Sequence, residues 1–114
     1  MKNKTNKLVN GFLGNLLKDY LGKDPFKYEK EMDVQSNLVS TFPPSFVTCS
    51  VNDGLVGYGP IFLDKLKDAD VTHIYKEYGH HDKSINHVFH LNIRNDEAAK
   101  LNREQIEFFR QFID

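Results

Sequence analysis

Apolar residues recur every three to four positions in three parts of the chain, and this spacing predicts helices. Over residues 8–21, pairs of apolar residues recur every four positions, and Gly22 follows at the place where a helix would end. Helical spacing also extends over residues 58–69 and 96–113. We therefore expect three helices, with the second and third in the C-terminal two thirds of the chain.

Two shorter segments are rich in β-branched and aromatic residues, which favours strands. The first, residues 46–51, lies between a proline pair and an Asn-Asp-Gly turn sequence. The second, residues 71–78, mixes apolar and polar side chains, as strands near a sheet edge do. Because the helix at 58–69 separates them, the order predicts a parallel β-α-β unit. The expected fold class is α/β, with two parallel strands and three helices.

The remaining segments show no regular period. Residues 1–7 are polar, and we expect them to be disordered. Residues 23–45 hold three of the four prolines, which is typical of an irregular connection. No repeat divides the rest, and 114 residues suit one domain. Residues 8–114 are therefore predicted to form a single domain.

Composition narrows the class of protein. The 15 Lys and Arg residues nearly balance the 16 Asp and Glu residues, which argues against a nucleic-acid-binding protein. No apolar run approaches the roughly 20 residues that a membrane-spanning helix needs, and no secretory signal is recognisable. A single cysteine, Cys49, excludes an internal disulfide framework and fits a reducing compartment. We expect a cytoplasmic protein without a membrane span.

Two residues that could carry chemistry follow the predicted strands. Asp53 comes directly after the strand at 46–51, and His87 lies in the loop after the strand at 71–78. The carboxyl ends of parallel strands share one edge of a sheet, so the two side chains should lie at the same edge. An aspartate that orients a histidine base forms two thirds of a serine-hydrolase triad. On spacing alone, a turn aspartate and an ordinary loop histidine are the simpler interpretation.

Three short motifs flank the predicted strands: Phe-Pro-Pro-Ser-Phe-Val at 42–47, Asn-Asp-Gly-Leu at 52–55 and His-Val-Phe at 87–89. In this order and spacing, over about residues 12–113, the chain resembles the C-terminal part of the α/β-hydrolase fold, in the esterase and lipase branch related to hormone-sensitive lipase. In that branch a proline pair opens the penultimate strand, Asp-x-Leu supplies the triad acid and His-x-Phe supplies the triad base. The resemblance implies that Asp53 is the acid and His87 the base, that no cofactor is needed, and that the substrate is a small-molecule ester.

Two parts of the hydrolase machinery are missing from this sequence. The nucleophile of the fold lies in a Gly-x-Ser-x-Gly elbow, and a glycine-rich loop supplies the oxyanion donors. None of the five serines has glycines at that spacing, and no such loop occurs. The resemblance therefore implies the C-terminal portion of an esterase or lipase, whether from a truncated gene, a split gene or an expressed fragment.

Two functions follow from these observations. The first is a serine carboxylic-ester hydrolase whose serine comes from an N-terminal part that this sequence does not contain. The second is a non-catalytic remnant or interaction module that keeps the local packing of the fold. Since a general base must act on a nucleophile, the chain by itself is predicted to be inactive in both cases.

Other candidate sites have simpler explanations. The His-His-Asp sequence at 80–82, with His87 and His90 nearby, could be taken for a metal site, but structural zinc sites need four closely spaced ligands, and we expect a solvated loop that binds no metal. His90 could replace His87 as the base, although the His-x-Phe register favours His87. Cys49 lies among apolar residues of a predicted strand, which is typical of a buried and unreactive thiol.

The predicted sheet is too small to be stable without further contacts. Two strands leave edges unpaired, and a two-stranded sheet is marginal in water. A second copy of the chain, related by a twofold axis, could cover the exposed surface. We therefore expect a homodimer or higher oligomer, with the strand at 46–51 or the helix at 8–21 in the interface.

Overall fold

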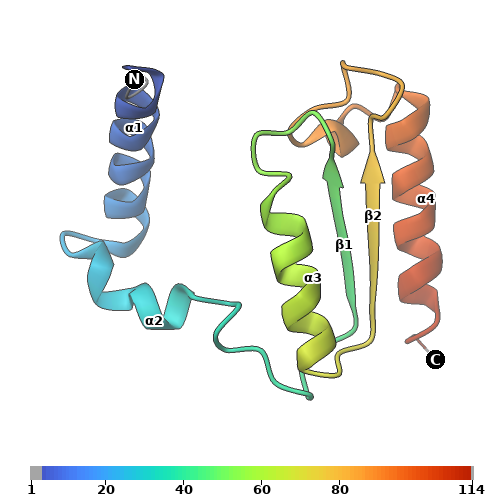
Figure 1. The fold of residues 1–114 in the computed structure, drawn as a ribbon, viewed down its shortest axis with the longest axis horizontal. Coiled ribbons are helices and arrows are strands. Elements are labelled where there is room, and N and C mark those ends of the chain that lie inside the picture. The colour runs from blue at the N-terminus through green and yellow to red at the C-terminus, as the bar shows by residue number, and fades with distance from the viewer. Residues whose placement is uncertain (1–3, 114) are drawn as a thin grey trace. The chain divides into compact units, whose positions relative to one another are not determined.

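The computed structural model describes residues 4–113 (Figure 1). The chain divides into two compact units, Met1–Asn37 and Leu38–Asp114. This boundary lies inside the stretch of residues 8–114 that the sequence predicts as one domain. Each unit is therefore described by itself.

The first unit contains only helices. Helix α1 spans Lys4–Leu21 and ends at Gly22, whose φ of +88° places it in the left-handed region that favours glycine. The amide of Gly22 donates to the carbonyl of Lys18 at 2.8 Å, so the predicted end of this helix is confirmed. Residues 4–7 belong to this helix, although the sequence predicts disorder over 1–7. Lysine is a good helix former, which favours this extension. Residues 1–3 of the predicted disordered segment lie outside the described residues.

Two short helices occupy part of the segment that was expected to be irregular. Helix η1 (Pro25–Tyr28) is a 3₁₀ helix with proline in its first turn, where the missing N–H has no partner to lose. Helix α2 (Glu29–Met32) follows directly and has two glutamates in its first turn, which suits the positive end of the helix dipole. The preferences of single residues for helix positions therefore form two short helices in a segment without a repeating apolar pattern.

The second unit is built on two parallel strands. Strand β1 (Ser45–Ser50) pairs with β2 (His73–Tyr78), and helix α3 (Tyr58–Asp68) connects them. The predicted parallel β-α-β unit is confirmed, with strand limits that differ by one or two residues. After β2 come a loop, the short 3₁₀ helix η2 (Phe89–Leu91) and helix α4 (Asp96–Arg110), which ends three residues before the predicted limit.

The two longer helices of this unit cover opposite faces of the sheet (Figure 1). On one face the ring of Phe46 in β1 lies 5.7 Å from that of Phe108 in α4. On the other face Tyr75 of β2 lies under Gly59 of α3, where an added Cβ would stand only 2.6 Å from the tyrosine oxygen. Since neighbouring residues of a strand point to opposite faces, this alternation explains how one short sheet holds two helices.

One cluster of buried side chains joins the end of β2, the loop after it and α4. Tyr78, Ile85 and Leu101 form a cluster against which Phe89 packs, so the loop after β2 is held to the sheet by its own apolar residue. The cap of α4 is Asn95, whose side-chain oxygen accepts from the backbone N–H groups of the first turn. Within residues 4–113, no helix has both the length and the apolar character that crossing a membrane requires.

Candidate active site

Asp53 lies in the turn that ends β1. Its amide donates to the carbonyl of Ser50 at 3.0 Å, and its Oδ1 accepts from the amide of Leu55 at 2.8 Å. Asp favours such turns because its short side chain bonds the backbone two residues on. The Leu55 bond, and after it the ring of His87, hold the pKa of Asp53 below its ordinary value, although partial burial opposes this. Asp53 is therefore a carboxylate at neutral pH.

His87 follows the loop that leaves β2 and precedes η2. Its amide donates to the side-chain oxygen of Asn86 at 2.7 Å. The next residue, Val88, has a φ of +50°, a left-handed conformation that β-branched residues seldom adopt. The amide of Phe89 donates to the carbonyl of Asn86 at 3.1 Å and closes a tight turn around the histidine. The chain is thus folded sharply at the residue that was predicted as the base.

The structure brings Asp53 and His87 together. The distance between Asp53 Oδ2 and His87 Nδ1 is 2.7 Å. A carboxylate only accepts hydrogen bonds, so Nδ1 carries the proton and Nε2 of the neutral ring is left with its lone pair. The Asp53 side chain is 14% exposed and that of His87 61%. A shielded acid thus orients a base that is open to solvent.

This contact confirms the predicted proximity of the two residues, while their catalytic roles remain a prediction. Within the described part of the chain, Nε2 of His87 makes no hydrogen bond. It is the atom that would take a proton from a substrate or nucleophile in an Asp–His arrangement. None of the five serine hydroxyls bonds to it, and the most buried one, Ser50 Oγ, donates to the carbonyl of Ile85.

The competing sequence candidates lie elsewhere. His90 is in η2, with its ring 6.5 Å from that of Phe89, and does not contact the aspartate. Cys49 is half-buried on the α3 face of the sheet, where its sulfur lies 3.3 Å from the hydroxyl of Tyr75. Among residues 4–113, no three His, Cys, Asp or Glu side chains gather where they could hold a metal ion.

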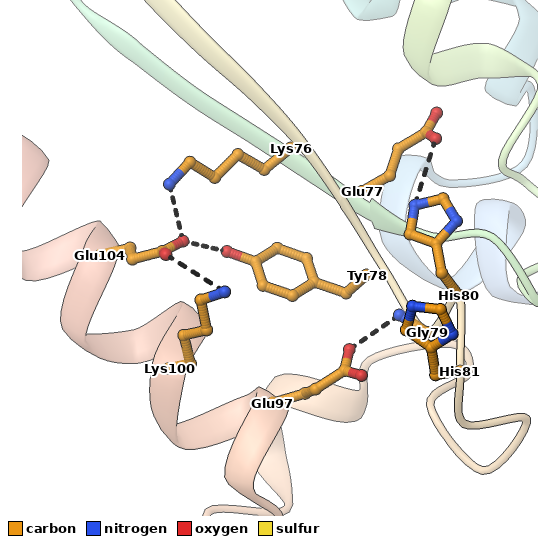
Figure 2. A pocket seen from close by; sticks show the side chains of 9 residues that line it. All are labelled: Lys76, Glu77, Tyr78, Gly79, His80, His81, Glu97, Lys100 and Glu104. Atoms are coloured by element: carbon orange, nitrogen blue, oxygen red, sulfur yellow. Dashed lines mark hydrogen bonds and ion pairs between the residues drawn. The ribbon is translucent and has the colours of Figure 1, made fainter.

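A cavity of about 460 Å³ opens between the end of β2 and α4, and the Asp–His pair is not among its lining residues (Figure 2). Figure 2 shows the hydroxyl of Tyr78 and the ammonium of Lys76 directed at the carboxylate of Glu104. Their distances to Glu104 Oε2 are 2.5 and 2.9 Å. Glu97 accepts from the amide of Gly79 at 2.8 Å. The hydroxyl of Tyr75 donates to Glu77 at 2.7 Å, so all three carboxylates that line the cavity are hydrogen-bonded, and those of Glu97 and Glu104 connect α4 to the end of β2.

The sequence analysis missed this polar cluster. A usable signal was present, because Lys76 and Tyr78 lie two apart on one strand face, and Glu97, Lys100 and Glu104 lie three and four apart on one helix face. Burial raises the pKa of Tyr78, and its bond to Glu104 adds to the effect. Although burial alone would raise the pKa of Glu104, the bonds from Tyr78 and Lys76 hold it below its ordinary value.

The chain was compared with models of protein families, with curated proteins and with solved structures. No family model matches it. No curated protein matches it, and no solved structure matches it. What the site can do is therefore argued from its own geometry.

Proposed function

We propose that Asp53 and His87 are the acid and base of a serine ester hydrolase whose serine is supplied by a segment outside these 114 residues. The observation that carries this proposal is the 2.7 Å contact between Asp53 Oδ2 and His87 Nδ1 at the carboxyl edge of the sheet. It agrees with the order of the three motifs, in which an acid and a base follow the last two strands of the fold.

The chemistry assigns one role to each side chain. Nε2 of His87 takes the proton of the serine hydroxyl as its oxygen attacks the ester carbonyl, and the imidazolium returns that proton to the departing alcohol. Water then enters in the same way and releases the acid from the serine. Asp53 stays ionised and stabilises the imidazolium, a role that its lowered pKa suits.

The proposal requires that the chain be inactive alone. With no serine bonded to His87, a fluorophosphonate probe should not label the isolated chain, and short p-nitrophenyl esters should be hydrolysed no faster than by free imidazole. Stoichiometric labelling of any serine would contradict the assignment.

The decisive experiment restores the missing serine. The DNA before the codon of Met1, and the neighbouring genes, are translated and searched for a Gly-x-Ser-x-Gly segment, which is then co-expressed with the chain. We expect hydrolysis of p-nitrophenyl butyrate that falls roughly 10²–10⁴-fold in His87→Ala, while the matched control His90→Ala keeps its rate. Hydrolysis that is equal in the His87→Ala and control proteins would refute the proposal.

The alternative is a non-catalytic interaction module. It is favoured by the many exposed apolar side chains of the second unit, such as Ile93 and Ile113. In that case no serine-bearing segment is found, or the co-expressed pair forms a complex without hydrolysing esters. The same experiment therefore separates the two functions.

A further inference from the structure

The side-chain amide of Asn52 contacts backbone carbonyl groups of the loop that leads to His87. Its Nδ2 lies 3.0 Å from the carbonyl oxygen of Gly79, 3.1 Å from that of Asp82 and 3.0 Å from that of Ile85. These three residues span the loop after β2, between the end of the strand and the histidine. One side chain just after β1 thus contacts the loop at its beginning, middle and end.

Ser50 supports this arrangement from below. The hydroxyl of Ser50, which is fully buried, donates to the carbonyl of Ile85 at 2.5 Å and accepts from the backbone N–H of Asn52 at 3.1 Å. Gly79 packs directly on both side chains, since an added Cβ would stand 2.8 Å from Asn52 Nδ2 and 2.9 Å from Ser50 Oγ. The loop therefore lies against the strand end with no space for another side chain.

Asn52 lies next to the Asp53–His87 pair in the chain and in the structure. Asn52 immediately precedes Asp53, and Ile85 lies two residues before His87. Of these neighbouring residues of one turn, Asp53 bonds to the ring of His87, and Asn52 bonds to the backbone of the loop that precedes the histidine. Residues 79–86 form no helix or strand, so the position of the ring depends on the side-chain contacts of this loop, which include the buried Ile85 and the bonds from Ser50 and Asn52. Because an acid–base pair must keep its geometry to within about 0.5 Å, such supporting contacts matter.

We propose that Asn52 is a positioning residue for the Asp53–His87 pair, which it maintains by holding the loop 79–86 over the carboxyl end of β1. This inference rests on the proposed function for its catalytic meaning, but the contact that it explains can be measured without any activity. Asn52 acts together with the buried Ile85 and the hydroxyl of Ser50, and among the described side chains it is the one that reaches three carbonyl groups of this loop.

The test is the tautomer of His87, read from long-range ¹H–¹⁵N correlation spectra of the full chain at alkaline pH. The parent chain should show the Nδ1–H form that Asp53 selects. Asn52→Ala should lose most of this excess, because the loop is released and the ring leaves the carboxylate. The matched control is Asn102→Ala, whose amide also binds backbone carbonyls, those of His90 and Ala98, but not those of this loop. It should leave the tautomer unchanged.

Each outcome decides the proposal. A folded Asn52→Ala chain that keeps the Nδ1–H form of His87 would overturn it. Should this variant not fold, Asn52→Ser, which keeps one shorter donor, is measured instead and should lose part of the Nδ1–H excess. If the parent chain shows no such excess, both the pair and the proposed function are lost. If the excess depends on Asn52 but no serine-bearing segment restores hydrolysis, the positioning role stands and only the catalytic proposal fails.

Discussion

The two units of the chain place their apolar side chains differently. In the second unit, Leu66 and Leu101 are 0% and 1% exposed, and the other fully buried residues lie in that unit too. In the first unit, within residues 11–37, whose side chains the structure describes, none is fully buried. Phe12 and Tyr20 on α1 are 63% and 78% exposed. Both units contain amphipathic helices, yet among the residues whose side chains are described only the second unit has a core.

The difference in burial between the two units shows that forming a helix and burying its apolar side chains have separate requirements. The hydrogen bonds of a helix join residues four apart, so the sequence of a segment such as α1 favours a helix before any other surface is present. Burial needs a second surface, and in the second unit the parallel strands supply it, because each strand presents one face to α3 and the other to α4. Most of the stability is therefore expected in residues 38–114, and the predictions below test this difference.

The largest expected effect concerns assembly. We predict that the exposed apolar residues of α1 contact a second copy, so that light scattering after size-exclusion chromatography gives at least twice the chain mass of 13.2 kDa. Leu16→Asp should lower this mass towards the monomer, whereas Asn15→Asp on the same helix should not. A well-folded monomer at micromolar concentration would contradict the prediction. An oligomer unaffected by Leu16→Asp would place the interface on β1.

The next largest effect is on stability, and it is tested by truncating one leucine in each unit. Leu101→Ala removes a fully buried side chain and should lower the free energy of unfolding by about 2–5 kcal/mol. Leu16→Ala removes a side chain that is nearly half exposed and, at a concentration where the chain is monomeric, should lower it by less than about 1 kcal/mol. Urea unfolding followed by circular dichroism measures both. Equal losses would show that the first unit has a core of its own in solution.

Acid should weaken the polar contact between β2 and α4. The pKa of Glu104 is lower in the folded chain than in the unfolded one, so its contribution to stability is present at neutral pH and disappears as the pH falls below about 4. Glu104→Gln should therefore lower the free energy of unfolding by about 1–3 kcal/mol at pH 7. The difference from the parent chain should vanish in acid.

The matched control for this experiment is Glu107→Gln, an exposed carboxylate on the same helix. It should change stability little at either pH. A loss in Glu104→Gln that is the same at pH 7 and in acid would mean that packing, and not charge, explains the effect.

The smallest expected effects are the changes in stability when one glycine in each unit is replaced by alanine. Gly14 of α1 has open space where a Cβ would lie, so Gly14→Ala should raise helix stability by up to about 1 kcal/mol. Gly79 has a φ of +84° and packs on Asn52 and Ser50, so Gly79→Ala should destabilise the second unit by more than about 1 kcal/mol. Thermal unfolding followed by circular dichroism distinguishes the two signs. A loss in Gly14→Ala would indicate a close neighbour at that face of α1.

Local pattern by itself determined the three longer helices and the two strands of this protein. The helical spacing, the glycine at the end of α1 and the Asn-Asp-Gly turn act over a few residues, where backbone preference and nearest-neighbour bonds decide the conformation. The same pattern placed Asp53 and His87 at one edge of a parallel pair, since strand direction follows from the crossover helix. It missed η1, α2 and η2, which are too short to show a period.

Tertiary structure alone decided which side chains meet. Asn52 reaches Gly79 and Ile85, 27 and 33 positions along the chain, and Tyr78 reaches Glu104 across 26 positions. It also decided that the apolar face of α4 is buried while that of α1 is largely exposed. The physical reason is that these contacts depend on where the crossover and the loop bring distant segments, and preferences that act over a few residues do not encode that placement.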